Sequence, residues 1–148
     1  MLPSGSTARL VELGGLDEVL AYYSALAEQP PPGVVDILPA ARTVMVTIDP
    51  SRTELRSLDQ ALNQVQPKYD ARAPGELIEV PVVYDGEDLG DVAELLECDP
   101  DEVVRRHTAE EWTVAFCGFA PGFGYMTARD STWSTPRRSS PRTKVPAG

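Results

Sequence analysis

The segment FCGFAPGFGYM, residues 116–126, combines aromatic rings with glycines and is the first candidate for a functional loop. Glycine-rich loops that bind nucleotides follow defined spacings, G-x-G-x-x-G or G-x-x-x-x-G-K-[ST]. Here Gly118, Gly122 and Gly124 give G-x-x-x-G-x-G, no helical pattern follows them, and no Gly-Lys-Ser/Thr occurs. The spacing therefore excludes both nucleotide-binding motifs in this loop.

The same segment predicts a tight turn through Pro121 and Gly122 that presents Phe119, Phe123 and Tyr125. Glycine lets the backbone approach a ligand closely and adopt positive φ, and the rings can form apolar walls. A ligand-binding loop is one interpretation. A structural turn that covers a hydrophobic core is the other, and the residues of the loop alone favour it.

A second pattern lies in the segment STPRRSSPRTKVPAG, residues 134–148, where prolines recur every five residues. Arg137 and Arg142 directly follow the first two of these prolines. Proline restricts φ, so two guanidinium groups held at a fixed separation would be preorganised for a carboxylate or a phosphate. A disordered tail that binds an SH3-like groove through its prolines is an equally open interpretation.

Recognisable motifs for acid-base, nucleophilic or metal chemistry are sparse. His107 is the only histidine, and its place near the end of a predicted helix favours a structural role in capping helix carbonyls. Cys98 and Cys117 lack the spacing of a zinc site, and the acids at 85–91 lack the pattern of a calcium loop. We expect no metal site, and the catalytic residues stay unknown.

Composition narrows the classes of function. The 148 residues allow one ordinary domain or two very small ones, and the formal net charge of −10 argues against nucleic-acid binding. Residues 127–148 nevertheless carry five basic side chains and one acidic one, which suggests docking on a partner, on the acidic body or on an anionic ligand. No signal peptide and no apolar run of membrane-spanning length is recognised, so we expect a cytoplasmic protein without a membrane partner.

The elements that must position these residues follow from hydrophobic periodicity. The pattern predicts a strand at 8–13, a helix at 16–29, a hairpin of strands at 34–38 and 43–48, and a helix at 53–65. This βαββα order predicts a small α+β unit of the split-βαβ, ferredoxin-like kind, with its helices on one face of the sheet.

Beyond a proline- and glycine-containing linker at 66–76, the pattern changes. We expect an edge strand at 77–86, interrupted by Pro81, and a buried strand at 112–118, with loops from 118 onward. Two short helices lie between them, at 91–97 and 99–107, and Asp99 is the natural N-cap of the second.

Taken together, the two motifs are specific for one family. The sequence resembles the KipI family, also described as allophanate hydrolase subunit 1, as the B subunit of 5-oxoprolinase, or as subdomains C and D of a carboxyltransferase domain. That family has F-x-P-G-F-x-Y followed by T-P-R-x-x-x-P-R-x-x-V-P-A-G. The matching residues here are Phe119, Pro121, Gly122, Phe123 and Tyr125, then Thr135, Pro136, Arg137, Pro141, Arg142, Val145, Pro146, Ala147 and Gly148.

The resemblance implies an architecture and partners. We expect an α+β amino-terminal domain at 1–75 and, at 76–148, an incomplete cyclophilin-like β-barrel, of which only the start is present, so that the chain looks truncated after Gly148. The implied partners are a sister subunit of related barrel fold, similar to allophanate hydrolase subunit 2 or to the C subunit of 5-oxoprolinase, and a further lactam-utilisation subunit. ATP is the implied cofactor, handled together with these partners.

The resemblance also implies a function. The expected activity is that of a non-autonomous subunit of an ATP-dependent amidohydrolase, which converts 5-oxoproline, ATP and water to glutamate. Phe119, Phe123 and Tyr125 are then expected to wall the substrate pocket, Pro121 and Gly122 to shape its turn, and Arg137 and Arg142 to hold an anion. The alternatives are a KipI-like regulator that inhibits a histidine kinase and a urea carboxylase-like carboxyltransferase component.

Overall fold

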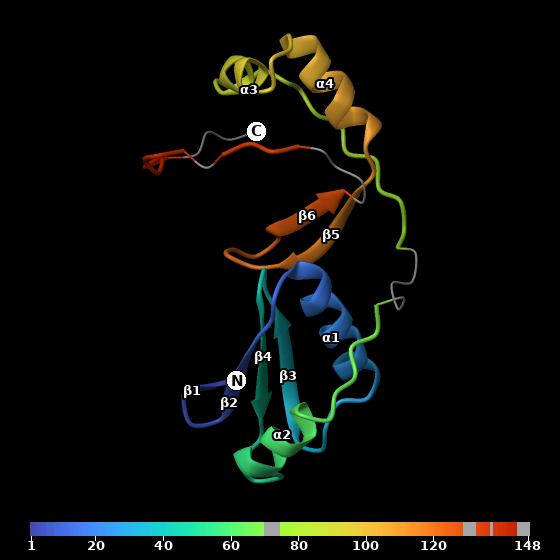
Figure 1. Ribbon diagram of the computed structural model, residues 1–148, viewed down its shortest axis with the longest axis vertical. Coiled ribbons are helices and arrows are strands. Elements are labelled where there is room, and N and C mark those ends of the chain that lie inside the picture. Colours follow the sequence, from blue (N-terminus) through green and yellow to red (C-terminus); the bar gives the residue numbers. More distant parts are fainter. Residues whose placement is uncertain (70–74, 129–132, 137, 145–148) are drawn as a thin grey trace. The chain divides into compact units, whose positions relative to one another are not determined.

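The computed structural model describes residues 1–69, 75–128, 133–136 and 138–144 (Figure 1). The chain divides into two compact units, Met1–Gly75 with Ala115–Tyr125, and Glu76–Val114 with Met126–Gly148. The helices within the described ranges include none that is both long and apolar enough to cross a membrane.

The first unit contains a four-stranded antiparallel sheet. Its strands are β1 (Leu2–Ser4), β2 (Ala8–Glu12), β3 (Val34–Pro39) and β4 (Thr43–Ile48), in the spatial order β1-β2-β4-β3 (Figure 1). β4 is antiparallel to both of its neighbours, and Val46 pairs with Arg9 on one side and Ile37 on the other. The hairpin predicted from the two β-rich runs is confirmed, whereas β1 has only three residues, one of them Pro3, and was not recognised in the sequence.

Two helices cover one face of this sheet. α1 (Leu16–Glu28) contacts β3 and β4, and α2 (Leu55–Leu62) contacts β2. Along β4 every second residue is buried, because a strand alternates its side chains between the two faces. The strand residues Val44, Val46 and Ile48 join Val19, Tyr22, Leu26, Leu58 and Leu62 from the helices in one core.

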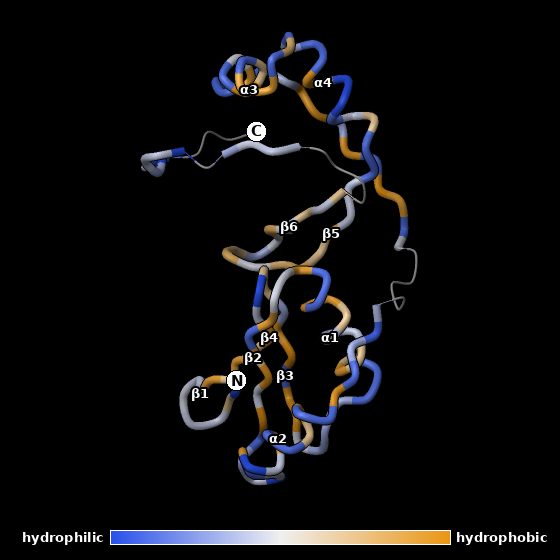
Figure 2. Tube along the Cα trace, viewed as in Figure 1, coloured by the Kyte–Doolittle hydropathy of each residue, from blue (hydrophilic) through white to orange (hydrophobic). Residues whose placement is uncertain are grey.

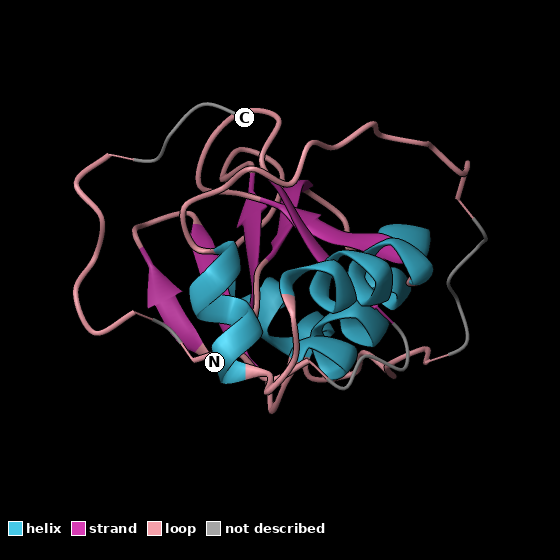
Figure 3. Cartoon of the chain, turned by 90° about the horizontal axis from the view of Figure 1, so that it is seen from above, coloured by secondary structure: helices cyan, strands magenta, loops and turns pink. Residues whose placement is uncertain are grey.

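The predicted fold class is confirmed at its coarse level. The chain is a mixed α/β protein with antiparallel sheets, coloured by element type in Figure 3, and both predicted helices of the first unit form. The sheets among the described residues, one of four strands and one of two, include no closed barrel. The finer assignments, split-βαβ for the first unit and cyclophilin-like for the second, stay predictions.

Polar contacts also join the helices of the first unit to their surroundings. Arg9 on β2 and Asp59 on α2 form a two-point ion pair, with Nε to Oδ1 at 2.6 Å and Nη2 to Oδ2 at 3.1 Å. The hydrogen bonds from Arg9 lower the pKa of the Asp59 carboxyl. The hydroxyl of Tyr22 donates to the Leu62 carbonyl at 2.8 Å, which links α1 to the last residue of α2. Burial raises the pKa of Tyr22 to about 12.

Replacing Tyr22 by phenylalanine is expected to lower the free energy of unfolding by about 1 kcal/mol near neutral pH, because the buried Leu62 carbonyl loses its donor. The loss should shrink at alkaline pH. Above pH 10.0 the unfolded chain ionises Tyr22 first, so the wild-type protein loses stability between pH 10.0 and about 12, and the variant does not. Urea unfolding at pH 8 and pH 11 measures both effects.

The matched control is Tyr23→Phe, which removes the hydroxyl of a partly buried neighbour on the same helix. We expect that variant to unfold within about 0.5 kcal/mol of the wild type. A Tyr22→Phe protein as stable as the wild type at pH 8 would contradict the role of this hydrogen bond.

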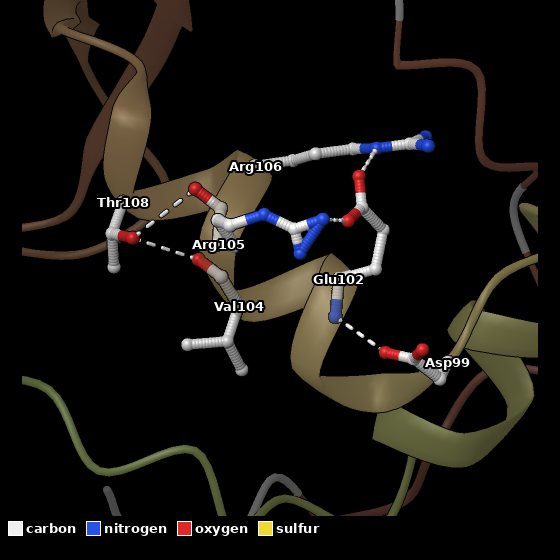
Figure 4. A network of polar contacts seen from close by, with 6 residues as sticks. All are labelled: Asp99, Glu102, Val104, Arg105, Arg106 and Thr108. Carbon is white, nitrogen blue, oxygen red and sulfur yellow. Dashed lines mark hydrogen bonds and ion pairs between the residues drawn. The ribbon is translucent and has the colours of Figure 1, made fainter.

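The second unit contains two short helices, α3 (Leu89–Leu95) and α4 (Pro100–Ala109). α4 begins as predicted, with Pro100 in its first turn and the Asp99 carboxylate accepting the Glu102 amide at 2.7 Å (Figure 4). The Glu102 carboxylate does not complete a capping box, because it pairs instead with Arg105 and Arg106 on the same helix (Figure 4). These charges lie three and four positions apart, the spacing at which helix side chains meet.

Two predictions about strands are wrong. The apolar segment 77–83 forms no strand, although its hydropathy matches one; Figure 2 draws it as an orange stretch beyond the grey linker. Pro81 lacks an amide hydrogen, and Leu77, Ile78 and Val83 are each more than 70% exposed, so neither a ladder nor a buried face holds the segment as a strand.

The other correction concerns residues 112–128. β5 (Trp112–Cys117) forms where a strand was predicted, but none of its residues is buried. It pairs with β6 (Gly124–Ala128), which lies where only loop was expected. β6 is only five residues long and begins with Gly124 directly after the Pro121–Gly122 turn, so a search for hydrophobic runs missed it. Pairing with β5 supplies the hydrogen bonds that hold it.

Candidate functional site

The loop between β5 and β6 is built from two successive turns. The Phe123 amide donates to the Ala120 carbonyl at 3.0 Å, closing a turn with Pro121 and Gly122 at its centre. Gly122 has a φ of 77°, which suits the third position of a type II turn, where glycine is favoured. The proline-glycine turn predicted from the sequence is therefore present.

Phe119 forms the centre of the other turn. The Ala120 amide donates to the Gly118 carbonyl at 2.8 Å across it, and Phe119 has a φ of 65°. A three-residue turn with positive φ is rare and strained for a residue with a side chain. The Gly118 amide donates to the Phe123 carbonyl at 3.0 Å and closes the loop around this strained residue. The strain is thus held by the backbone hydrogen bonds of the hairpin.

Four aromatic rings of this hairpin form a continuous series of ring-to-ring contacts. We call these residues, Phe116, Phe119, Phe123 and Tyr125, the aromatic row. Phe119 meets Phe123 edge to face at 5.5 Å between centroids, Phe123 meets Tyr125 at 5.2 Å, and Tyr125 stacks on Phe116 at 4.5 Å. Phe119 is 90% exposed and Phe123 46%. The rings therefore pack on one another rather than into a closed core, and the aromatic row presents an apolar surface to solvent.

The structure describes only one of the two arginines that were predicted to bind an anion. Arg137 lies outside the described residues. Arg142 lies in the second unit, where its Nη2 contacts Asp88 Oδ1 and lies 3.7 Å from Glu87 Oε2. Arg138, to which the sequence pattern assigned no role, donates from Nη1 to the same Asp88 oxygen at 2.6 Å. We call Arg138 and Arg142 the arginine pair.

Two of the acids at 85–91, in which the sequence showed no calcium-loop pattern, thus contact the basic tail. The signal was present as two clusters of opposite charge, but nothing in the sequence says that residues 50 and 54 positions apart meet. Among the residues that the structure describes, no group of three His, Cys, Asp or Glu side chains could hold a metal ion.

His107 lies in an aromatic cluster of the second unit. Its Nδ1 is 2.7 Å from the hydroxyl of Tyr84, and its ring lies 4.8 Å from that of Trp112 and 6.1 Å from that of Trp133. The helix carbonyls that the imidazole was expected to cap are served by other groups. Trp112 Nε1 donates to the His107 carbonyl at 3.1 Å, and the Thr108 hydroxyl donates to carbonyls within α4 (Figure 4).

Comparison with known families gives a match over the whole chain. Residues 1–148 match the model of the family described as carboxyltransferase domain, subdomain C and D. Two curated relatives are named as the B subunit of 5-oxoprolinase. The one from Bacillus subtilis (strain 168) is 31% identical in an alignment over 154 residues, gaps included. The alignment covers 93% of this chain and 62% of the relative. The one from Haemophilus influenzae is 43% identical over 77 residues, 50% of this chain and 36% of the relative.

A solved structure is similar as well. A crystal structure of TTHA0988 matches with a TM-score of 0.69 and 30% sequence identity, over 95% of this chain and 29% of that chain. This chain therefore spans less than two thirds of the length of the relatives and of the structure that it matches.

Proposed function

Because the chain belongs to the family of the carboxyltransferase domain, subdomains C and D, we propose that it is a subunit of a heteromeric ATP-dependent amidohydrolase of the 5-oxoprolinase type. The complex would open the lactam ring of 5-oxoproline to give glutamate, using ATP and water. The observation that carries this proposal is the 31% identity, over 93% of the chain, to a protein named as the B subunit of 5-oxoprolinase.

The proposed site uses the loop between β5 and β6. Phe119, Phe123 and Tyr125 would supply apolar walls for the five-membered ring, and Pro121 with Gly122 would set the shape of the turn. The exposure of the aromatic row supports this role, because rings already buried in a core have no surface left for a ligand.

Two arginines of the tail are proposed to bind an anion. Arg137 and Arg142 would hold the carboxylate of the substrate or the phosphate of an activated intermediate, since a guanidinium matches both groups with two donors. The ion pair of Arg142 with Asp88 supports this role, because Asp88 is itself a carboxylate.

ATP would be handled with partner subunits. The sequence carries neither of the two nucleotide-binding glycine motifs, so no step through ATP is assigned to residues of this chain. The proposed partners are a sister subunit of related barrel fold and a lactam-utilisation subunit, and we propose that the complex acts in the cytoplasm.

The test is to co-express the chain with both partners and to measure ATP-dependent glutamate formation from 5-oxoproline. Arg142→Ala is expected to lower kcat/KM about 30-fold, the effect of losing a charge-assisted hydrogen bond to the substrate. Arg56→Ala, which removes the same charge from an exposed position on α2, is the control and should leave kcat/KM unchanged. Absence of 5-oxoproline-dependent activity in the complete complex overturns the proposed function, and full activity of the Arg137→Ala/Arg142→Ala protein overturns the anion-binding role.

A regulatory protein that inhibits a histidine kinase is the second candidate. The observation that favours it is Phe119, a strained residue that is 90% exposed, as expected of an anchor for a protein surface. Under this alternative, Phe119→Ala would abolish kinase binding in a pull-down assay, and the complex with the two partner subunits would turn over no 5-oxoproline.

A further inference from the structure

One carboxylate oxygen, Oδ1 of Asp88, is shared by both members of the arginine pair. We propose that Asp88 is an internal competitor in a carboxylate-binding site made by Arg138 and Arg142, and that a ligand carboxylate takes its place. The inference rests on the proposed function for the class of anion, and it assigns the site to Arg138 in addition to Arg142.

Most N–H donors of the arginine pair are not used in the contacts with Asp88. A guanidinium has five N–H donors, and each arginine gives Asp88 only one nitrogen, Nη1 of Arg138 and Nη2 of Arg142. The second acid nearby, Glu87, lies 3.7 Å from Arg142 and is 77% exposed, so it adds little. A ligand carboxylate that offers both oxygens to a guanidinium fork gains hydrogen bonds that Asp88 does not make.

Exchange at this place is feasible because the ion pair is accessible. The side chains of Arg138 and Asp88 are 54% and 40% exposed, so solvent screens their attraction and an exposed pair of this kind is weak. Arg142 is 27% exposed and is the less accessible of the two arginines. The Asp88 side chain also does not cap a helix. It occupies the N-cap position of α3, but its carboxylate accepts no capping hydrogen bond. Releasing Asp88 from the arginines therefore breaks no helix cap.

An internal competitor of this kind lowers the apparent affinity of the site for its ligand. When an internal group occupies the binding residues for part of the time, the apparent affinity of the ligand falls by the fraction of molecules in which the site is open. The arginine pair would thus respond to a carboxylate ligand only at concentrations that outcompete Asp88, and removing Asp88 should tighten the binding.

The experiment is a titration of the 148-residue chain with 5-oxoproline as carboxylate probe, followed by the Nε–Hε resonances of arginine and the side-chain carboxyl resonances of aspartate. Asp88→Asn is expected to tighten the dissociation constant about fivefold, the weight of an exposed ion pair. In the wild-type chain the Asp88 carboxyl resonance should move together with the arginine resonances as Asp88 is displaced.

The control is Asp91→Asn, which removes the same charge three residues further along, from an exposed side chain of α3. It should bind the probe as the wild type does. In the Asp88→Asn background, Arg138→Lys should return the affinity to the wild-type level or below, because lysine keeps the charge and loses the fork.

Several results would overturn the inference. These are equal affinities of Asp88→Asn and the wild type, equal gains from Asp88→Asn and Asp91→Asn, and an unmoved Asp88 resonance in the wild-type titration. Tighter binding of inorganic phosphate than of 5-oxoproline overturns the choice of a carboxylate ligand. The titration needs neither partners nor ATP, so its failure is distinguishable from failure of the proposed enzyme activity.

Discussion

Replacing Leu26 by alanine is expected to lower the free energy of unfolding of the first unit by about 3 kcal/mol, and its Tm by about 15 °C. Leu26 is 1% exposed and belongs to the core between α1, α2 and β4. The change removes buried methyl groups and leaves a cavity, because β4 and the two helices fix the walls around it. Loss of stability at this position therefore reports directly on the packing of the core.

The measurement must isolate the first unit, since a chain of two compact units need not unfold in one transition. Hydrogen exchange of the β4 amides at increasing urea does this, because β4 is an inner strand of the sheet, paired on both sides. Val35→Ala is the matched control. Val35 lies on β3 of the same sheet and is 58% exposed, so we expect a change within about 0.5 kcal/mol. A Leu26→Ala loss as small as that of the control would refute the assignment of the core.

The second large effect is expected from Gly33→Ala, which should lower the free energy of unfolding by about 2–4 kcal/mol. Gly33 lies between α1 and β3 and has a φ of 82°, a conformation that alanine adopts with strain. A Cβ at this position would lie 2.4 Å from Cγ2 and 2.8 Å from Cβ of Thr53. Rotation about the Cα–Cβ bond of Thr53 moves Cγ2 but not Cβ, so a change of side-chain rotamer does not remove both contacts.

Two variants separate the contributions to this loss. Gly5→Ala also places alanine at positive φ, but a Cβ there meets no atom within 4 Å, so it measures the backbone strain alone. Gly33→Ala combined with Thr53→Gly removes the two close contacts and should recover the difference between Gly33→Ala and Gly5→Ala. Thermal unfolding followed by circular dichroism compares these variants with the wild type. If Gly33→Ala costs no more than Gly5→Ala, the close packing of Gly33 on Thr53 is wrong.

Local sequence patterns determined much of the first unit. The 3.6-residue periodicity of α1 and α2 and the β-branched runs of β3 and β4 each predicted their element, because each run carries its own periodicity. Asp99 likewise predicted the start of α4, since an N-cap acts on an amide only three positions away. The same holds for the Pro121–Gly122 turn of the candidate site.

Only the tertiary structure decided which distant groups meet. The segment 77–83 has the composition of a strand but no partner among the described strands, whereas β6 has a weak composition and forms because β5 pairs with it. The sequence predicted the aromatic residues of the loop between β5 and β6, and the fold decided which rings contact one another. The sequence also singled out Arg142, and the fold decided that Arg138 and Arg142 both contact Asp88. Pairing and ion contacts depend on residues far apart in the chain, and a local pattern carries no information about which distant residue supplies the other half.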